Sequence, residues 1–328
     1  MQGVRGACVV ITGASSGIGR ATARAFAERG AHLVLAARRA EVLDDVVREC
    51  ERRGGQAIAV PTDVTDQEAV AALRRRAIEH FGGIDVWVNN AGVGAIGAYQ
   101  DVPLDLHLRT VEVNLLGGMY GAYEALPVFL RQGHGTLINT ISIGAFAPTP
   151  FAAAYTASKF GLRGFAASLR QELVDHPDIH VCSVFPAVVD TPGLEHGANH
   201  SGRRIDPGAF IYAPEDVAAT ILDLVRRPRA EVAVGWPAQV AKIAYGLAPG
   251  LTERAIGAAL RHGLARAERA PLTDGSLRRP VMRGTAVSGG WRERKGAPST
   301  GKISAAILAL AGVALLVSTS AAASRRAR

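Results

Sequence analysis

Short apolar runs alternate with longer segments of helical period through the first 235 residues of the chain. The runs lie at residues 7–11, 32–37, 57–60, 84–88, 136–141, 179–185 and 231–234. Apolar strands separated by helices are typical of a parallel sheet covered by helices on both faces. We therefore predict an α/β fold, a doubly wound parallel sheet of about seven strands, in a domain that spans residues 1–235.

A glycine-rich turn follows the first apolar run. Residues 12–19 read Thr-Gly-Ala-Ser-Ser-Gly-Ile-Gly, and a helix is predicted from residue 20 to residue 29. Strand, turn and helix in this order direct backbone N–H groups and a helix N-terminus towards a phosphate, as in a Rossmann-type nucleotide site. The spacing is Gly-x-x-x-Gly-x-Gly and not the common Gly-x-Gly-x-x-Gly. A flexible turn is the alternative, but the flanking strand and helix argue against it.

Within this turn, Gly13 would permit the tight bend, Gly17 would let the backbone approach a pyrophosphate, and Gly19 would allow close packing of helix on strand. The predicted cofactor-binding residues of the turn are Gly13, Ser15, Ser16, Gly17, Ile18 and Gly19.

The second predicted strand ends at Ala37, and Arg38 follows. An acidic residue at this place would accept hydrogen bonds from the adenosine ribose of NAD. A guanidinium instead suits a 2′-phosphate, because its planar fork can bind two oxygens at once. We therefore expect NADP(H) to be favoured over NAD(H), the alternative being that Arg38 is a solvated charge at a helix start.

Tyr155 and Lys159 stand four residues apart in a predicted helix, and Ser142 precedes them by thirteen residues. Residues at this spacing share a helix face. A phenol has a pKa of about 10, and a nearby cation lowers it. The pair can thus exchange a proton with an alcohol or carbonyl oxygen.

With these residues in place, the chain resembles the short-chain dehydrogenase/reductase family in its shorter single-domain form. The segments that carry the resemblance lie between residues 5 and 235 and appear in the order of the family: 12–19, Asp63-Val64, 89–92, Asn114, Ser142, Tyr155 with Lys159, and 186–191. One position departs from the pattern, because Ala187 stands where the family usually has glycine. An alanine would be strained there if the backbone required a positive φ.

The resemblance implies an oxidoreductase that transfers hydride between NADP(H) and a carbonyl or alcohol substrate. Tyr155 would be the general acid/base, Lys159 would lower its pKa and hold the nicotinamide ribose, and Ser142 would stabilise charge on the substrate oxygen. Asn114 would hold a water in a proton relay. The alternative is a catalytically silent NADP(H)-binding scaffold or regulator.

The resemblance also implies further cofactor contacts. Asp63 and Val64 would flank the adenine, and Asn90, Ala91 and Gly92 would line the ribose and nicotinamide side. Val189 and Thr191 would contact the carboxamide. We further expect a homo-oligomer and a small-molecule substrate. Apolar residues predicted to face that substrate, namely Ile143, Ala145, Phe146, Phe151 and Phe210, favour an apolar or lipid-like carbonyl compound.

The cysteine, histidine and charge content of the chain narrows the range of compartments and ligands that we expect. The three cysteines, Cys8, Cys50 and Cys182, are scattered, which suits a reducing compartment. His196 and His200 lack a third ligand, so we expect no metal site. The chain starts without a charged-then-apolar leader, which favours a cytoplasmic catalytic domain. The net charge of +8 is concentrated near the C-terminus, but no motif supports nucleic-acid binding.

Three further segments follow the domain. Residues 236–269 are predicted to be a helical extension, in which Leu251, Ile256, Leu260 and Leu264 lie near one side of a helix that also carries arginines. Such a helix packs on the domain or the substrate cleft, or lies on an acidic membrane surface. Residues 270–302 hold prolines, glycines and arginines, and we expect a basic linker without strong order.

Residues 303–324 carry no charge. As a helix these 22 residues would span about 33 Å, and a bilayer core is about 30 Å thick. We therefore predict a transmembrane or membrane-associated helix that anchors the catalytic domain. The alternative is a helix that is buried or that contacts another subunit.

Overall fold

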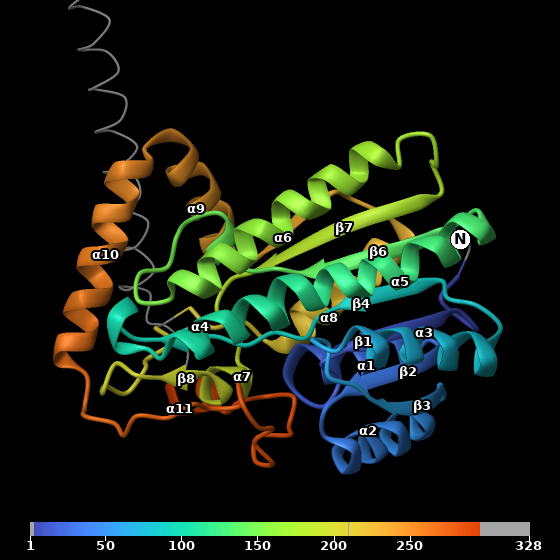
Figure 1. The fold of residues 1–328 in the computed structure, drawn as a ribbon, viewed down its shortest axis with the longest axis horizontal. Coiled ribbons are helices and arrows are strands. Elements are labelled where there is room, and N and C mark those ends of the chain that lie inside the picture. The colour runs from blue at the N-terminus through green and yellow to red at the C-terminus, as the bar shows by residue number, and fades with distance from the viewer. Residues whose placement is uncertain (1–2, 209, 296–328) are drawn as a thin grey trace, which may run out of the picture.

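The computed structural model describes residues 3–208 and 210–295, which build a parallel sheet between two layers of helices (Figure 1). The seven strands of this sheet are β1 (Cys8–Thr12), β2 (His32–Ala37), β3 (Gln56–Pro61), β4 (Val86–Asn89), β6 (Gly135–Thr140), β7 (Ile179–Pro186) and β9 (Glu231–Val234). Their order is β3-β2-β1-β4-β6-β7-β9, and every pairing is parallel. The predicted doubly wound sheet is confirmed.

Six long helices cover the sheet. One face packs against α1 (Gly17–Ala27), α2 (Ala40–Arg52) and α8 (Pro214–Arg226). The other packs against α3 (Gln67–Phe81), α5 (Gly117–Gln132) and α6 (Ala153–Glu172). The shorter α4 (Leu104–Val111) precedes a π-helical turn at Glu112–Leu116, which runs directly into α5.

Strand residues alternate between these two cores. Val9 and Ile11 lie in the cluster with α1 and α8, whereas Val10 lies in the cluster with α3 and α5. All three are fully buried. Because both faces of the sheet are covered, the strands are apolar throughout and do not alternate with polar residues.

The chain reverses direction across the sheet between β1 and β4. From β1 it steps outward to β2 and β3, and after β3 it returns to β4 on the other side of β1. In open α/β sheets, ligands bind at such a switch point, beyond the carboxyl ends of the strands. The turn after β1 and the segment after β4 are therefore placed side by side at the site.

Two helices follow the last strand, α9 (Trp236–Leu247) and α10 (Pro249–Arg266). A second, two-stranded sheet joins β5 (Ala95–Ile96) to β8 (Ala198–Asn199). It ties the segment after β4 to the segment that follows α7 (Gly193–His196).

Residues 270–295 differ from the linker that composition led us to expect. They pack against the domain and end in α11 (Trp291–Lys295). Leu277 is 0% exposed, and Val287 is 4% exposed. Leu277 and Val287 pack against apolar residues of the domain, and backbone hydrogen bonds join other parts of the segment to it.

Within residues 3–208 and 210–295, no helix is both long and apolar enough to cross a bilayer. The predicted membrane helix at 303–324 lies outside the described residues. The membrane anchor therefore stays a prediction.

Candidate active site

The turn after β1 is shaped by its glycines. Gly13 has a φ of 68°, which an L side chain rarely adopts, and a Cβ there would lie 2.9 Å from Ala91 Cα. At Gly19 a Cβ would overlap the Gly13 carbonyl oxygen. The N-terminus of α1 can thus pack directly on the turn, beside the groove.

Thr12 fastens this turn to the segment after β4. Its hydroxyl accepts hydrogen bonds from the amides of Asn90 (3.0 Å) and Ala91 (3.1 Å). The Asn90 amide nitrogen donates to the Thr12 carbonyl at 3.0 Å. The two loops at the switch point therefore form one rigid floor.

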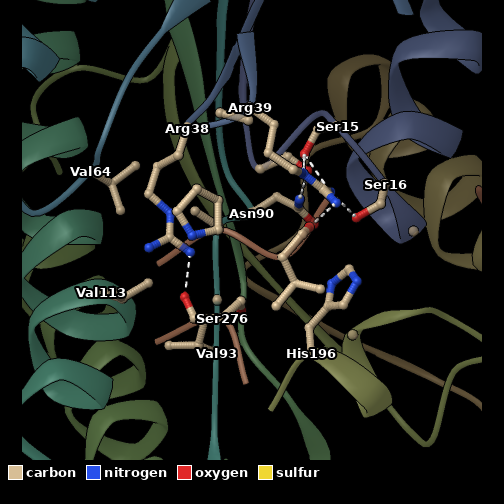
Figure 2. Close-up of a pocket in the computed structure, with 18 of the residues that line it drawn as sticks. Ser15, Ser16, Arg38, Arg39, Val64, Asn90, Val93, Val113, His196 and Ser276 are labelled. Atoms are coloured by element: carbon tan, nitrogen blue, oxygen red, sulfur yellow. Dashed lines mark hydrogen bonds between the residues drawn. The ribbon is translucent and has the colours of Figure 1, made fainter. Parts of the chain in front are cut away.

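Arg38 and Arg39, which follow β2, both line the groove (Figure 2). The Arg38 side chain extends along the cavity, and its Nη2 donates to the Ser276 carbonyl at 2.6 Å. Arg39 donates from Nη2 to the hydroxyls of Ser15 (2.8 Å) and Ser16 (3.0 Å). Arg39 therefore holds both serines of the turn in place.

The charges around these guanidinium groups favour an anion. Burial lowers the pKa of Arg39, and Arg38 and Arg20 lower it further. Burial also lowers the pKa of Arg38, and Asp63 opposes that shift. In the part of the chain that the structure describes, no carboxylate forms an ion pair with either group. Two unpaired cations in a partly buried cavity create a site that a phosphate would satisfy.

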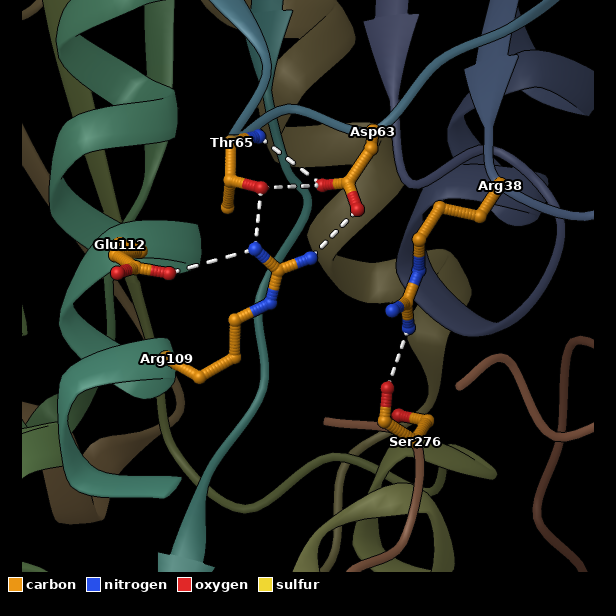
Figure 3. A network of polar contacts seen from close by, with 6 residues as sticks. All are labelled: Arg38, Asp63, Thr65, Arg109, Glu112 and Ser276. Carbon is orange, nitrogen blue, oxygen red and sulfur yellow. Dashed lines mark hydrogen bonds and ion pairs between the residues drawn. The ribbon is translucent and has the colours of Figure 1, made fainter. Parts of the chain in front are cut away.

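Asp63, which also lines the groove, is held by Arg109 (Figure 3). Its Oδ2 accepts from Arg109 Nη2 at 2.6 Å, and its Oδ1 accepts from the Thr65 amide at 3.1 Å and hydroxyl at 2.8 Å. Burial raises the pKa of the Asp63 carboxyl, but the hydrogen bonds from Thr65 and Arg109 outweigh it and the net shift is downward. Asp63 is thus a fixed, ionised acceptor.

Tyr155 projects from the first turn of α6 and lies partly buried between Gly94 and Gly144. A Cβ on either glycine would come within 3.4 Å of the phenol ring. Burial raises the pKa of Tyr155, and a hydrogen bond with the Ser142 side chain lowers it in part. The net direction is opposite to the one expected from the nearby cation alone.

Lys159 lies one turn further along α6 and is 4% exposed. Its Nζ donates to the Thr140 carbonyl at 3.1 Å and lies 5.7 Å from the centre of the Tyr155 ring. Burial lowers the pKa of this ammonium from 10.5 to about 8. The same desolvation that disfavours the phenolate therefore disfavours the ammonium.

Asn114 stands in the π-helical turn at Glu112–Leu116, a feature that often marks functional positions in helices. Its Oδ1 accepts from the Val93 amide at 2.8 Å, and its Nδ2 donates to the Val93 carbonyl (2.9 Å) and the Ser158 hydroxyl (3.0 Å). Asn114 therefore fixes the segment after β4 against α6, which carries Tyr155 and Lys159.

Most of the predicted cofactor residues line one cavity. These are Gly13, Ser15, Ser16, Gly17, Ile18, Arg38, Asp63, Val64, Asn90, Ala91, Gly92 and Thr191. Four do not line it: Gly19 packs on Gly13, Val189 is buried in the core, and Tyr155 and Lys159 lie on α6 next to Gly94 and Gly92. Asn114 borders a small adjoining cavity.

Backbone strain falls next to the start of α6 and not at Ala187. Among the described residues, Phe151 is the one non-glycine residue with a positive φ, at 63°. Ala187 donates from its amide to Val234 and needs no special conformation. The alanine in place of glycine is thus accommodated without strain.

The cavity also contains residues that the sequence reasoning missed. Arg39 could have been predicted as a cavity residue, because it directly follows Arg38 in the chain. His196 lines the cavity and contacts the Arg283 carbonyl at 3.1 Å through Nε2. Ser276, Pro280 and Val281 complete one wall. No local pattern marks these three, because they arrive from a part of the chain more than 230 residues after Arg38.

Other reactive side chains lie apart from this cavity. Cys8, Cys50 and Cys182 are free and buried. His200 pairs with Asp274 at 3.0 Å. Within residues 3–208 and 210–295, no group of three or more His, Cys, Asp or Glu side chains is arranged to hold a metal ion.

Comparison with known proteins identifies the family. The family model for short chain dehydrogenase matches residues 7–200. The chain belongs to the short-chain dehydrogenase family. It is 37% identical over 259 residues to the uncharacterized oxidoreductase YxnA of Bacillus subtilis, covering 77% of this chain and 72% of that protein. It is also 37% identical over 223 residues to 3beta-hydroxysteroid dehydrogenase 1 of Eggerthella lenta, covering 66% of this chain and 85% of that protein.

Solved structures of this family share the fold. An alcohol dehydrogenase of the archaeon Thermococcus sibiricus, complexed with 5-hydroxy-NADP, superposes with a TM-score of 0.62 at 28% identity, over 70% of this chain and 95% of that one. A metagenomic short-chain oxidoreductase in complex with NADP gives a TM-score of 0.60 at 32% identity, over 70% of this chain and 97% of that one. The protein is therefore an oxidoreductase of the short-chain dehydrogenase family, and the relatives with solved structures bind NADP-type cofactors.

Proposed function

We propose that this protein is an NADP(H)-dependent oxidoreductase that interconverts a carbonyl compound and its alcohol, with Tyr155 as general acid/base. The observation that carries the proposal is that Tyr155, Ser142 and Lys159 lie beside a groove that also contains the guanidinium groups of Arg38 and Arg39. A Cβ added to Gly92, which lines the groove, would lie 3.6 Å from Lys159 Nζ, and one added to Gly94 would lie 3.4 Å from the Tyr155 ring. NADP(H), when bound, supplies or accepts the hydride. The protein must then supply the proton and stabilise charge on the substrate oxygen.

The side chains divide this work. Tyr155, whose pKa is raised by burial, keeps its proton at neutral pH and can give it to a carbonyl oxygen as negative charge develops there. Ser142 lies within hydrogen-bond reach of the phenol and can donate to the same oxygen. Lys159 places a cation behind the phenol when it is protonated, which stabilises the phenolate left after proton transfer.

Cofactor choice rests on the adenosine end of the groove. Arg38 and Arg39 present two cations there, and no acidic residue ends β2 to receive a ribose 2′-hydroxyl. We infer that NADP(H) is preferred over NAD(H), with Arg38 as the contact to the 2′-phosphate. The presence of NADP-type cofactors in the two structural relatives supports this choice.

The proposed substrate cavity is partly apolar. A second cavity is bounded by Ile96, Pro150 and Phe151 near the catalytic helix and by Leu260 and Leu264 of α10. Helix α10 thus faces this cavity with the side that the sequence showed to be apolar. Of the aromatic residues expected in the substrate wall, Phe146 is instead buried against Phe185. Of the five residues expected in that wall, Phe151 lines this cavity, and the charged residues Arg204, Asp206, Arg266 and Lys295 line it as well. Its apolar part supports an apolar carbonyl or alcohol substrate, and the similarity to a hydroxysteroid dehydrogenase agrees with it.

An exposed apolar face supports the proposed homo-oligomer. Leu104 and Leu108 of α4, and Met119 and Tyr123 of α5, have 37–67% of their surface exposed. Exposed patches of this kind often mark contacts between subunits. Light scattering should give a mass above that of one chain, and Tyr123→Asp should lower it. A wild-type chain that is monomeric at micromolar concentration would contradict the assignment of this face.

An assay with NADPH and a panel of aliphatic, aromatic and steroidal ketones tests the proposed reaction. We expect NADPH oxidation that depends on an apolar ketone, and NADP⁺ reduction with the matching alcohol. Binding of NADPH without turnover of any member of the panel would instead favour a scaffold that has lost catalysis.

A further inference from the structure

The segment 275–292, called the strap here, crosses the cofactor groove after the chain has left α10. It runs beside α7 and β8 and reaches the N-terminus of α1 (Figure 1). Three of its residues, Ser276, Pro280 and Val281, face the same cavity as Gly17 and Arg38. The strap therefore forms a wall of the groove that the sheet and the phosphate turn leave open.

One end of the strap is fastened to Asp190, which is 3% exposed. Asp190 Oδ1 accepts hydrogen bonds from the amides of Gly289 (3.1 Å) and Trp291 (2.8 Å). Its Oδ2 accepts from the Ser288 hydroxyl at 2.8 Å. A buried carboxylate needs such donors to offset its desolvation, so the strap and Asp190 stabilise each other. Asp190 directly precedes Thr191, which lines the groove.

Two apolar side chains fasten the rest of the strap. Leu277 is 0% exposed and packs with Ala95, Leu106 and Ala198. Val287 is 4% exposed and packs with small residues of α1 and α8. Met282, between them, is 55% exposed and contributes nothing to this packing. The strap is thus docked at both ends, with its middle spanning the groove.

The middle of the strap is joined to the phosphate turn itself. Arg39 donates from Nη1 to the Val281 carbonyl at 3.0 Å while its Nη2 donates to Ser15 and Ser16 (Figure 2). The Gly17 amide donates to the Ala286 carbonyl at 3.0 Å. Arg39 is therefore a positioning residue that couples the strap to the turn.

We propose that the strap is a clamp that closes over NADP(H) and retains it in the groove. This inference rests on the proposed cofactor. The turn, Arg38 and Asp63 still line a cavity beneath the docked strap, so the strap does not fill the groove. The Gly17 amide and the two guanidinium groups bond to strap carbonyls, so the phosphates of the cofactor would share or displace these bonds. Release then requires the strap to undock, and the strength of its anchors sets the dissociation rate.

The experiment measures cofactor release from the full chain. NADPH is bound, displaced with excess NADP⁺ in a stopped-flow instrument, and its fluorescence decay gives the dissociation rate constant. Leu277→Ala and Val287→Ala weaken the two apolar anchors separately, and Met282→Ala is the matched control within the strap. Circular dichroism and thermal melting confirm that each variant is folded.

We expect both anchor variants to release NADPH at least tenfold faster than wild type, because truncating a buried aliphatic side chain shifts a docking equilibrium by more than that factor. Met282→Ala should stay within twofold. In wild type, NADPH should slow amide hydrogen exchange across residues 275–292. Folded anchor variants that release NADPH at the wild-type rate would overturn the clamp.

Faster exchange of the strap on adding NADPH would also overturn it, since the strap would then compete with the cofactor for the Gly17 amide and Arg39. A wild-type chain that binds no NADPH would refute the proposed function as well as the clamp, so the two failures are distinguishable.

Discussion

Lys159 Nζ lies 5.7 Å from the centre of the Tyr155 ring, and both side chains project from the same face of α6. Burial acts on the two groups in the same sense. It raises the pKa of the phenol and lowers the pKa of the ammonium to about 8, so both neutral forms are favoured. The site therefore holds a cation that its buried surroundings destabilise.

Lys159→Met should stabilise the folded protein at pH 7 in the absence of added cofactor. The folded pKa of about 8 lies below the unfolded value of 10.5, so the cost of the buried ammonium is full below pH 8 and fades as the pH rises towards 10.5. A pKa unit corresponds to about 1.4 kcal/mol, which puts this cost on the order of 3 kcal/mol. Loss of the hydrogen bond to Thr140 offsets about 1 kcal/mol of the gain.

Thermal melting of both proteins from pH 6 to pH 10 measures this difference. The advantage of Lys159→Met should be constant below pH 8 and shrink above it, while its turnover is lost. An advantage that does not change with pH would show that packing, and not charge, is responsible.

Tyr155→Phe should abolish turnover and leave NADPH affinity nearly unchanged. The substitution removes the titrating hydroxyl and keeps the ring between Gly94 and Gly144. Proton transfer of this kind contributes about 10²–10⁴-fold to rate. Turnover and NADPH titration on the same sample separate the two effects. Retention of a tenth of the wild-type activity would remove Tyr155 from its proposed role.

Arg38→Ala should weaken NADPH and leave NADH affinity less affected. A charge-assisted contact to a phosphate contributes about 1.5–3 kcal/mol, so the dissociation constant for NADPH should rise by one to two decades. Arg38 also holds the Ser276 carbonyl of the strap, and loosening the strap would weaken both cofactors alike. Titration with NADPH and NADH therefore distinguishes a phosphate ligand from a strap contact.

Arg48→Ala is the control for charge, because Arg48 is exposed on α2 and pairs with Asp45. Equal affinity of the wild type for both cofactors would show that Arg38 does not contact a 2′-phosphate.

Much of the fold follows from local pattern. The seven apolar runs became the strands of one sheet because each is short, bounded by polar turns and buried on both faces. The glycine spacing after β1 marked the turn, because Gly13 and Gly19 occupy places where a Cβ would collide with Ala91 or with the Gly13 carbonyl. Each of these features is determined by residues that are close together in the sequence, so a local sequence pattern predicts it.

The strap and the Arg109–Asp63 pair could not be predicted in the same way. Arg109 meets Asp63 across 46 residues, and Ser276 meets Arg38 across 238. Each contact depends on how the chain is routed in space. Basic residues, prolines and glycines gave residues 270–295 the composition of a linker, although a few buried positions such as Leu277 suffice to dock them. The segment 303–324 is a further prediction from composition, and it calls for a direct test.

The full-length chain should sediment with membranes, and a chain that ends at residue 295 should stay in the soluble fraction and still hold NADPH. The apolar segment 303–324 would be buried in the bilayer, with Lys302 on one side and Arg325 on the other left at the interfaces. Residue 295 is the appropriate end point because it keeps the strap and α11. A chain that ends at residue 270 lacks the strap and should release NADPH faster.

Extraction conditions separate a spanning helix from surface binding by α10, which carries Arg254, Arg261 and Arg266. A helix that crosses the bilayer should resist high salt and alkaline carbonate and need detergent, whereas a basic surface helix should be released by salt. The chain that ends at residue 295 retains α10, so its sedimentation at low salt would assign membrane binding to that helix. If the full-length chain itself remains soluble at low salt, segment 303–324 is better explained as a packing or subunit-contact helix.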